Sequence, residues 1–588
     1  MYQGETSPVN SRWRNRGFGR EPRKPVALLV LTLLLAGLIA VSHFFRIPLS
    51  DSLLSFDFAV VYIVSGIAVL ALGIAWLVWL WFQSGGSAWW SRGVPITVVL
   101  LVVAGLVLYR PVFQGALLPD RWEPRFWDSR NLETLDHNRT VVWAEGDSRA
   151  FPQFLGPQRD GVVQAFDGDL ARIEDARRLW KKPIGEGWSG FVANGGLAWT
   201  LHQNGQYESV ACIEIDTGNL QWEHRSPRRH EEALGGPGPR ATPTLDQGRL
   251  FALGANGLLT CLEAGDGSVV WENDLSELLG IPVLTARNAA GQPTQLEDHD
   301  VAWGRSGSPL VYADLVIVPG GGPRDGDKVS LLAFDKTSGE LRWRAGDQQI
   351  GYASPVLLSL DGVPQIVTVN ESTITGHNPD TGVTLWSVPW PGDSGAASNT
   401  TQATAIGDNR ILISKGYGVG GAVFEIERDD AGIWQPRPVW ANPRVLKTKL
   451  TSAVVRDGYA WGLSDGILEC VDLETGDRLW KNGRYGHGQV LLVGDWLLVH
   501  SEDGFIAVVA ASPDDFQERG RLDTIGGVCW NTLCVYDDCI LVRSDLEAAC
   551  FRLPHRATVP EADGPGRPAV RDPAVLQETP ESRADRSP

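Results

Sequence analysis

The chain has 588 residues, with 52 lysines and arginines against 70 aspartates and glutamates, which gives a formal charge of −18. This acidic balance argues against a nucleic-acid-binding protein, because such proteins usually carry a basic surface that neutralises phosphates. Apolar residues make up 43% and charged residues 21% of the chain. The chain therefore has enough apolar material for a packed core and is not disordered as a whole.

The N-terminal part contains three long apolar runs, which are Val26–Phe45, Phe58–Phe82 and Val94–Phe113. A helix needs roughly 20 apolar residues to cross the hydrocarbon core of a bilayer. The only charged side chain within these runs is Arg110, near an end, where it can reach the interface. The sequence therefore predicts three transmembrane helices within residues 26–113. A cleaved signal peptide is the rival interpretation, but its apolar region would be shorter and no further spans would follow.

The orientation follows from the basic residues of the N-terminal tail, residues 1–25, which should stay in the cytoplasm. Three crossings then place the rest of the chain in the periplasm, so we expect a multi-pass protein of the cytoplasmic (inner) membrane. Residues 131–588 hold 40 basic and 63 acidic side chains, a formal charge of −23. The exported part is predicted to comprise a polar linker at 114–150, a folded domain at 151–554 and a disordered Pro-rich tail at 555–588.

A repeated phrase dominates the folded domain. It consists of an acidic residue or Asn, three residues, Gly, three residues and Trp, and its copies are EIDTGNLQW (214–222), EAGDGSVVW (263–271), DKTSGELRW (335–343), NPDTGVTLW (378–386) and DLETGDRLW (472–480). A polar turn with Gly between two short apolar runs is typical of a β-hairpin. The related tryptophans recur at Trp180, Trp222, Trp271, Trp343, Trp386, Trp440 and Trp480.

Two more short apolar runs precede each phrase, for example Gly248–Leu253 and Leu258–Leu262. Four strands in each repeat of about 40 to 50 residues are typical of a β-propeller blade. The long interval between Trp271 and Trp343 suggests an insertion near residues 284–301, which we place on a surface loop.

The ends of the domain predict the number of blades. The Trp180 strand lacks three preceding strands, whereas residues 526–553 supply three strands without a closing Trp. Together they complete one blade and close the ring without exposed edges. QERGRLDTI (517–525) is an outer strand without Trp. We predict an all-β, eight-bladed propeller, with seven blades as the alternative.

The repeated phrase resembles the tryptophan-docking repeat of the pyrroloquinoline-quinone (PQQ) dehydrogenase-like propellers, over about residues 151–553. The resemblance points to the non-enzymatic branch that includes BamB and to the PQQ-repeat proteins of Planctomycetes, which often begin as residues 152–161 do here, PQFLGPQRDG. This resemblance indicates the fold more strongly than the function.

A quinoprotein dehydrogenase, as the resemblance implies, would hold a quinone over a Trp and a calcium ion beside a catalytic Asp, often with a disulfide between adjacent cysteines. No two cysteines are adjacent in this chain. We identify no catalytic residues and no metal site, and we predict no cofactor; PQQ and calcium belong only to the alternative of an atypical quinoprotein dehydrogenase.

The seven cysteines form two groups. Cys212, Cys261, Cys470 and Cys550 share one position in their repeats, ahead of the turn, and are interpreted as buried core thiols. Cys529, Cys534 and Cys539 have a spacing that zinc seldom uses. A disulfide between two of these three remains open, because the sequence does not determine connectivity.

One group of residues suggests a binding site. Residues just before the innermost strands should line the mouth of the propeller channel, and there the sequence places Trp188, Arg240, Arg305, Tyr352, Lys447, Lys449, His487 and Trp530. Cations gathered there would bind carboxylates, acidic peptides or anionic glycans, with arginines as bidentate clamps and aromatic rings as stacking platforms. The alternative is that these are solvated turn residues.

The sequence thus favours a membrane-anchored envelope protein whose propeller binds proteins or peptides without catalysis. Its partners would be the membrane and other envelope proteins, and not nucleic acid. The alternatives are an atypical PQQ-dependent dehydrogenase and a carbohydrate-binding or sensor module.

Overall fold

The structure, a computed structural model, describes residues 108–112, 121–124, 132, 139–142, 146–232, 235–287 and 293–556. The predicted basic tail, the first two predicted spans, most of the third and nearly all of the Pro-rich tail lie outside these residues. Within the described ranges, no helix has the length and apolar character needed to cross a membrane.

The end of the third apolar run is extended. Residues Tyr109–Val112 form strand β1, which pairs antiparallel with β2 (Arg121–Pro124). The prediction of a helix up to residue 113 is therefore wrong for these four residues. Pro111 lacks an N–H group and also disfavours the helical conformation at the residue before it, which accounts for the difference.

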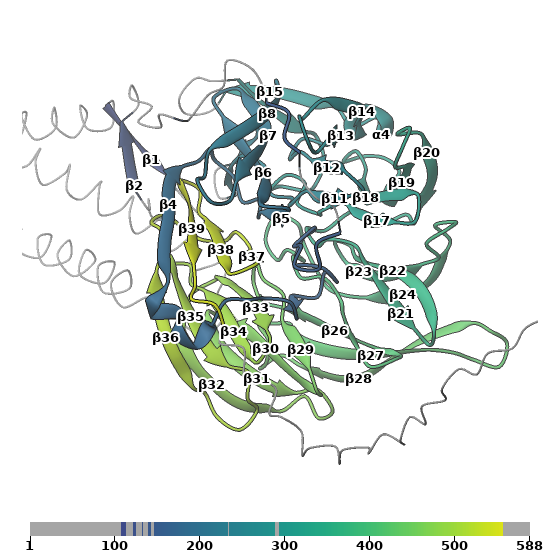
Figure 1. Ribbon diagram of the computed structural model, residues 1–588. Helices are drawn as coiled ribbons and strands as arrows, with labels where there is room; N and C mark the ends of the chain where they lie inside the picture. Colours follow the sequence, from purple (N-terminus) through teal and green to yellow (C-terminus); the bar gives the residue numbers. More distant parts are fainter. Residues whose placement is uncertain are drawn as a thin grey trace, which may run out of the picture.

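Eight sheets form the blades of a propeller within the described part of the chain, seven of four strands and one, in blade 7, of five, and Figure 1 shows them arranged in a ring. Blades 1 to 4 comprise β5 (Val192–Asn194), β6 (Leu197–Asn204), β7 (Tyr207–Glu214) and β8 (Leu220–Ser226); β11 (Thr244–Asp246), β12 (Arg249–Leu253), β13 (Leu258–Glu263) and β14 (Val269–Asp274); β17 (Leu310–Tyr312), β18 (Leu315–Gly321), β19 (Val329–Asp335) and β20 (Leu341–Ala345); β21 (Val356–Leu360), β22 (Val363–Val369), β23 (Thr373–His377) and β24 (Thr384–Pro389).

Blades 5 to 7 comprise β25 (Thr404–Ile406), β26 (Arg410–Lys415), β27 (Gly420–Arg428) and β28 (Trp434–Asn442); β29 (Val454–Arg456), β30 (Tyr459–Ser464), β31 (Ile467–Asp472) and β32 (Arg478–Arg484); β33 (Gln489–Val493), β34 (Trp496–His500), β35 (Phe505–Ala510) and β36 (Glu518–Asp523). Each blade is an antiparallel meander from an inner to an outer strand. The prediction of eight blades is confirmed.

Blade 8 joins the two ends of the domain. Its inner strands are β37 (Cys534–Tyr536), β38 (Cys539–Arg543) and β39 (Glu547–Arg552), and its outer strand is β4 (Arg177–Pro183). Cys550 pairs with Trp180 across β39 and β4, and Figure 1 shows the dark blue β4 beside the yellow β39. The predicted closure is therefore correct, and the outer strand of blade 7, β36, is the predicted strand without Trp.

Five of the seven repeated tryptophans dock onto a turn glycine of the next blade. Trp222 is fully buried, its Nε1 donates to the carbonyl of Ala264 at 3.0 Å, and its ring covers Gly267. The turn glycine has a φ of 73°, which favours glycine, and a methyl group there would meet the indole at 2.4 Å. The same packing joins Trp180 to Gly218, Trp271 to Gly339, Trp343 to Gly382 and Trp440 to Gly476.

The core lies between neighbouring blades. One cluster unites Trp199 and Cys212 of blade 1 with Leu250 and Leu262 of blade 2. All seven cysteines are buried free thiols, and burial raises the pKa of Cys261 and Cys470 to about 12. The interpretation of the repeat cysteines as core thiols is therefore correct, because such thiols stay protonated and unreactive at neutral pH.

The insertion between blades 2 and 3 differs from the predicted surface loop. It contains the short helix α4 (Leu275–Leu279) and a hairpin of β15 (Val283–Arg287) and β16 (Pro293–Glu297). Val283 and Leu284 are exposed, as expected for a surface segment. The side chain of Glu297, the last residue of β16, is in contrast only 1% exposed. A second small hairpin, β9 (Glu231–Glu232) with β10 (Gly236–Pro237), lies in the connector between blades 1 and 2.

Residues 151–163 fill the interior of the ring. Phe151 pairs with Ala193 of blade 1, and the guanidinium of Arg159 donates to the carbonyls of Pro309, at 2.8 Å, and Ser308, at 3.1 Å, before blade 3. Strand β3 (Val162–Val163) then runs parallel to β33 of blade 7. Because one short segment contacts inner strands on different sides of the ring, it must cross the channel, where Figure 1 shows it in dark blue. We call residues 151–163 the plug.

Candidate functional site at the channel mouth

Strand direction defines two faces of the ring. Inner strands begin at one face, which we call the mouth face, so it carries the connectors between blades and the turn between the second and third strand of each blade. The opposite face, the turn face, carries the tryptophan-docking turns. The eight residues predicted to line the mouth all lie in connectors ahead of inner strands, so they belong to one face as expected.

Aromatic residues from connectors of several blades lie near one another on the mouth face. The rings of Trp188 and Trp530 are 4.7 Å apart at an interplanar angle of 42°. Trp188 Nε1 donates to the carbonyl of Gly235 at 2.7 Å, and the ring of Trp303 lies on the other side of this glycine. The backbone N–H of Trp303 donates to the hydroxyl of Tyr352 at 3.0 Å. We call Trp530, Trp188, Trp303 and Tyr352 the aromatic arc.

Carboxylates stand at both ends of the aromatic arc. Glu502 accepts hydrogen bonds from Trp530 Nε1 at 2.8 Å and from the backbone N–H of His487 at 3.0 Å. At the other end, the Tyr352 hydroxyl donates to the carbonyl of Ser394 at 2.9 Å, and the Ser394 N–H donates to Glu371 at 3.1 Å. Both glutamates are half-buried. They belong to turns between second and third strands.

The cations of the mouth are engaged by the chain itself. Arg240 donates to the carbonyls of Gly235, at 3.1 Å, Gly236, at 2.7 Å, and Gly238. Lys447 forms an ion pair with Asp465. Lys449 lies 5.0 Å from the centroid of the Tyr417 ring, which is a cation–π contact.

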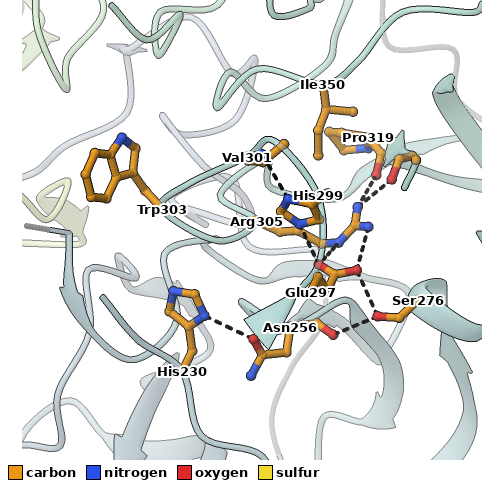
Figure 2. A network of polar contacts seen from close by, with 12 residues as sticks. His230, Asn256, Ser276, Glu297, His299, Val301, Trp303, Arg305, Pro319 and Ile350 are labelled. Carbon is orange, nitrogen blue, oxygen red and sulfur yellow. Dashed lines mark hydrogen bonds and ion pairs between the residues drawn. The ribbon is translucent and has the colours of Figure 1, made fainter. Parts of the chain in front are cut away.

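Arg305 is the most deeply buried of the predicted cations, at 1% exposed. Its Nε lies 2.8 Å from Glu297 Oε2 and its Nη2 lies 2.9 Å from Oε1, so the pair is bidentate. Ser276 donates to Glu297 at 2.8 Å, and His299 Nε2 lies 3.1 Å from the same carboxylate. Figure 2 shows these contacts, with Trp303 lying apart from them. The arginine thus anchors the insertion and is not open to an external anion.

The surroundings of Glu297 favour its ionised form. Its burial alone would raise the pKa of the carboxyl, but the adjacent Arg305 and the hydrogen bond to His299 hold that pKa well below the usual range. In Figure 2, His230 and Asn256 form a second contact near this pair, with Nδ1 and Oδ1 at 3.0 Å. Burial lowers the pKa of His230 well below its usual value, so this imidazole is neutral at pH 7.

The pKa of Glu208, at the start of β7, is shifted in the opposite direction from that of Glu297. Burial raises the pKa of its carboxyl to about 7, although the N–H of Ala255 and the nearby Arg240 and Arg228 partly offset the effect. Between the unfolded pKa, about 4.3, and pH 7, the folded state holds the proton that the unfolded state has lost. This group therefore makes the free energy of unfolding fall as the pH rises through that interval.

We expect Glu208→Gln to remove this pH dependence. The variant should match the wild type at pH 4 and be more stable by about 3 kcal/mol at pH 8. Urea unfolding at both pH values measures the difference, and comparison with the wild type cancels the opposite contributions of buried histidines such as His500, whose pKa burial lowers to about 4. Equal stability differences at the two pH values would contradict the assignment.

The residues of the mouth do not fit a bound quinone. PQQ carries three carboxylates, yet Arg240 and Arg305 are saturated by groups of this chain. The plug fills the channel beneath. Among the described residues, no group of His, Cys, Asp and Glu side chains is arranged to hold a metal ion.

The strand pairing and the docking of five repeat tryptophans on turn glycines define the class of protein, which is an eight-bladed β-propeller of tryptophan-docking repeats. The sequence profile of the family described as outer membrane protein assembly factor BamB matches residues 158–290 and 206–482, more than half of the chain. The chain belongs to this PQQ-repeat propeller family.

Three proteins illustrate the similarity. The outer membrane protein assembly factor BamB of Moranella endobia is 26% identical over 281 residues, which cover 46% of this chain and 64% of that protein. The crystal structure of BamB from Moraxella catarrhalis has a TM-score of 0.45 at 17% identity, covering 64% of this chain and all of that one. The quinohemoprotein alcohol dehydrogenase of Comamonas testosteroni has a TM-score of 0.47 at 14% identity, covering 70% and 82%.

Proposed function

We propose that the protein is a membrane-anchored envelope protein whose exported propeller is a non-catalytic scaffold that binds proteins or peptides at its mouth face. The observation that carries this proposal is the aromatic arc, which connectors of separate blades build and in which Trp303 and Trp530 are half-buried and Trp188 and Tyr352 are buried. The mouth cations, in addition, are already engaged by this chain. Its family includes the outer membrane protein assembly factor BamB, whose name supports a role beside other envelope proteins.

The course of the linker supports the presentation of the mouth to partners. Val141 donates its N–H to the carbonyl of Gly265 at 2.8 Å, in a docking turn of the turn face. Arg149 donates to Asp537 at 2.7 Å, in the turn between β37 and β38 on the same face. A tether formed by the apolar runs of residues 26–113 would therefore attach at the turn face and leave the mouth face directed away from the membrane.

Site-specific photocrosslinking in cells tests the proposal. A photoreactive residue at Ala396, exposed on the mouth face, should give discrete adducts with envelope proteins, whereas one at Thr337, exposed on the turn face, should not. Adducts of equal yield at both positions would contradict a mouth-specific scaffold. Oxidation of alcohols by the purified chain after addition of PQQ and calcium would overturn the non-catalytic assignment.

A further inference from the structure

Two carboxylates at the mouth have no cation among their hydrogen-bond donors in the described part of the chain. Glu502 and Glu371 are half-buried, and they accept hydrogen bonds from neutral groups, which are the indole of Trp530 and backbone N–H groups. A carboxylate that accepts only neutral donors keeps its full charge. The aromatic arc is therefore bounded by two carboxylates.

The cations nearby do not neutralise this charge. Arg240 directs its guanidinium to three backbone carbonyls and lies near the carboxyl groups of Glu208 and Glu232. Arg305 is held by Glu297. Lys447 is paired with Asp465. Each of these cations is thus engaged by other groups of this chain, and none of them contacts a carboxylate that bounds the arc.

The aromatic rings suit a cation. Indole faces attract guanidinium and ammonium groups, and tryptophan is the best of the aromatic side chains for this contact. Trp530 is half-buried beside Glu502, so one ligand cation can lie over the ring and pair with the carboxylate. Lys449 over Tyr417 already shows this geometry on the same face.

The net charge of the whole domain also favours a cationic ligand. Residues 131–588 carry a formal charge of −23, which concentrates cations near the surface and accelerates the association of basic ligands. An acidic peptide or an anionic glycan would meet repulsion and would find the arginines already occupied. The charges therefore favour a basic ligand over the anionic ligands expected from the sequence.

We propose that the aromatic arc binds an extended peptide segment rich in arginine or lysine, with one side chain of the segment stacked on Trp530 and paired with Glu502. This inference rests on the proposed function and adds the chemistry of the partner. It reverses the sign of the ligand predicted from the positions of the mouth cations.

Fluorescence anisotropy of labelled hexa-arginine and hexa-glutamate with the purified full chain tests the inference. Hexa-arginine should bind, more weakly as salt is added, and hexa-glutamate should not. Trp530→Ala should weaken hexa-arginine binding about tenfold and Glu502→Gln about threefold. Two matched controls should retain wild-type affinity: Trp434→Ala, which removes a half-buried indole of β28, and Glu474→Gln, which removes an exposed carboxylate of the turn face.

The outcomes separate this inference from the proposed function. Equal losses in Glu502→Gln and Glu474→Gln would show general attraction to an acidic domain and would overturn a site at the arc. Binding of hexa-glutamate, or no binding of either peptide, would also overturn it. If crosslinks at Ala396 persist in those cases, the scaffold stands and only the ligand chemistry is wrong; without such crosslinks, the proposed function fails as well.

Discussion

Replacing Glu297 with leucine should lower the free energy of unfolding by about 3–5 kcal/mol, because it leaves the Arg305 guanidinium buried without a counter-charge. Both side chains are 1% exposed, so solvent does not screen the loss. Ser276 and His299 would lose their partner as well. Urea unfolding followed by tryptophan fluorescence measures the effect.

The double variant Glu297→Leu with Arg305→Met is the decisive control. It removes both charges and should recover most of the loss, since apolar residues of similar volume often replace a buried ion pair at little cost. Glu474→Leu, which breaks the exposed pair with Arg410, should cost less than about 1 kcal/mol. A single variant as stable as the wild type would show that the pair does not anchor the insertion.

The Trp222→Ala variant should lose about 3–5 kcal/mol, because it opens a cavity between blades 1 and 2. The ring is fully buried, covers Gly267 and donates to Ala264. Trp434→Ala is the matched control: its half-buried indole lies 5.1 Å from Arg428, and its loss should cost about 1 kcal/mol. Similar losses in both variants, measured by urea unfolding, would refute the role of docking between blades.

The fold was largely predictable because its information is local and periodic. Each copy of the phrase encodes a turn with a positive-φ glycine. In three of the five copies, the tryptophan covers the turn glycine of the next blade, as Trp222 covers Gly267. The unmatched strands at the two ends predicted blade 8. The membrane spans of residues 26–113 remain predictions, because nearly all of these residues lie outside the described part of the chain.

The site was less predictable because its contacts join connectors and an insertion, which do not belong to the repeated phrase. The mouth positions followed from the periodicity, but nothing in the sequence indicates that Glu297 of the insertion neutralises Arg305. Glu502 and Glu371 were missed, although turns between second and third strands also point to the mouth face. The partners of Arg159 could not be predicted either, because the carbonyl groups that accept its hydrogen bonds lie about 150 residues further along the chain, before blade 3.

Blade 8 is built from strands at both ends of the domain, and this also determines the order in which the protein can assemble. Strand β4 leaves the ribosome before any of the seven complete blades, yet its partner β39 is made last. Until then, the hydrogen-bonding edge of β4 and the apolar face of blade 7 that packs on blade 8 stay open to other chains. The plug must also be threaded before the ring shuts. A nascent chain of this protein therefore needs protection from aggregation for nearly the whole of its synthesis, and any truncation before residue 534 leaves an open arc instead of a smaller ring.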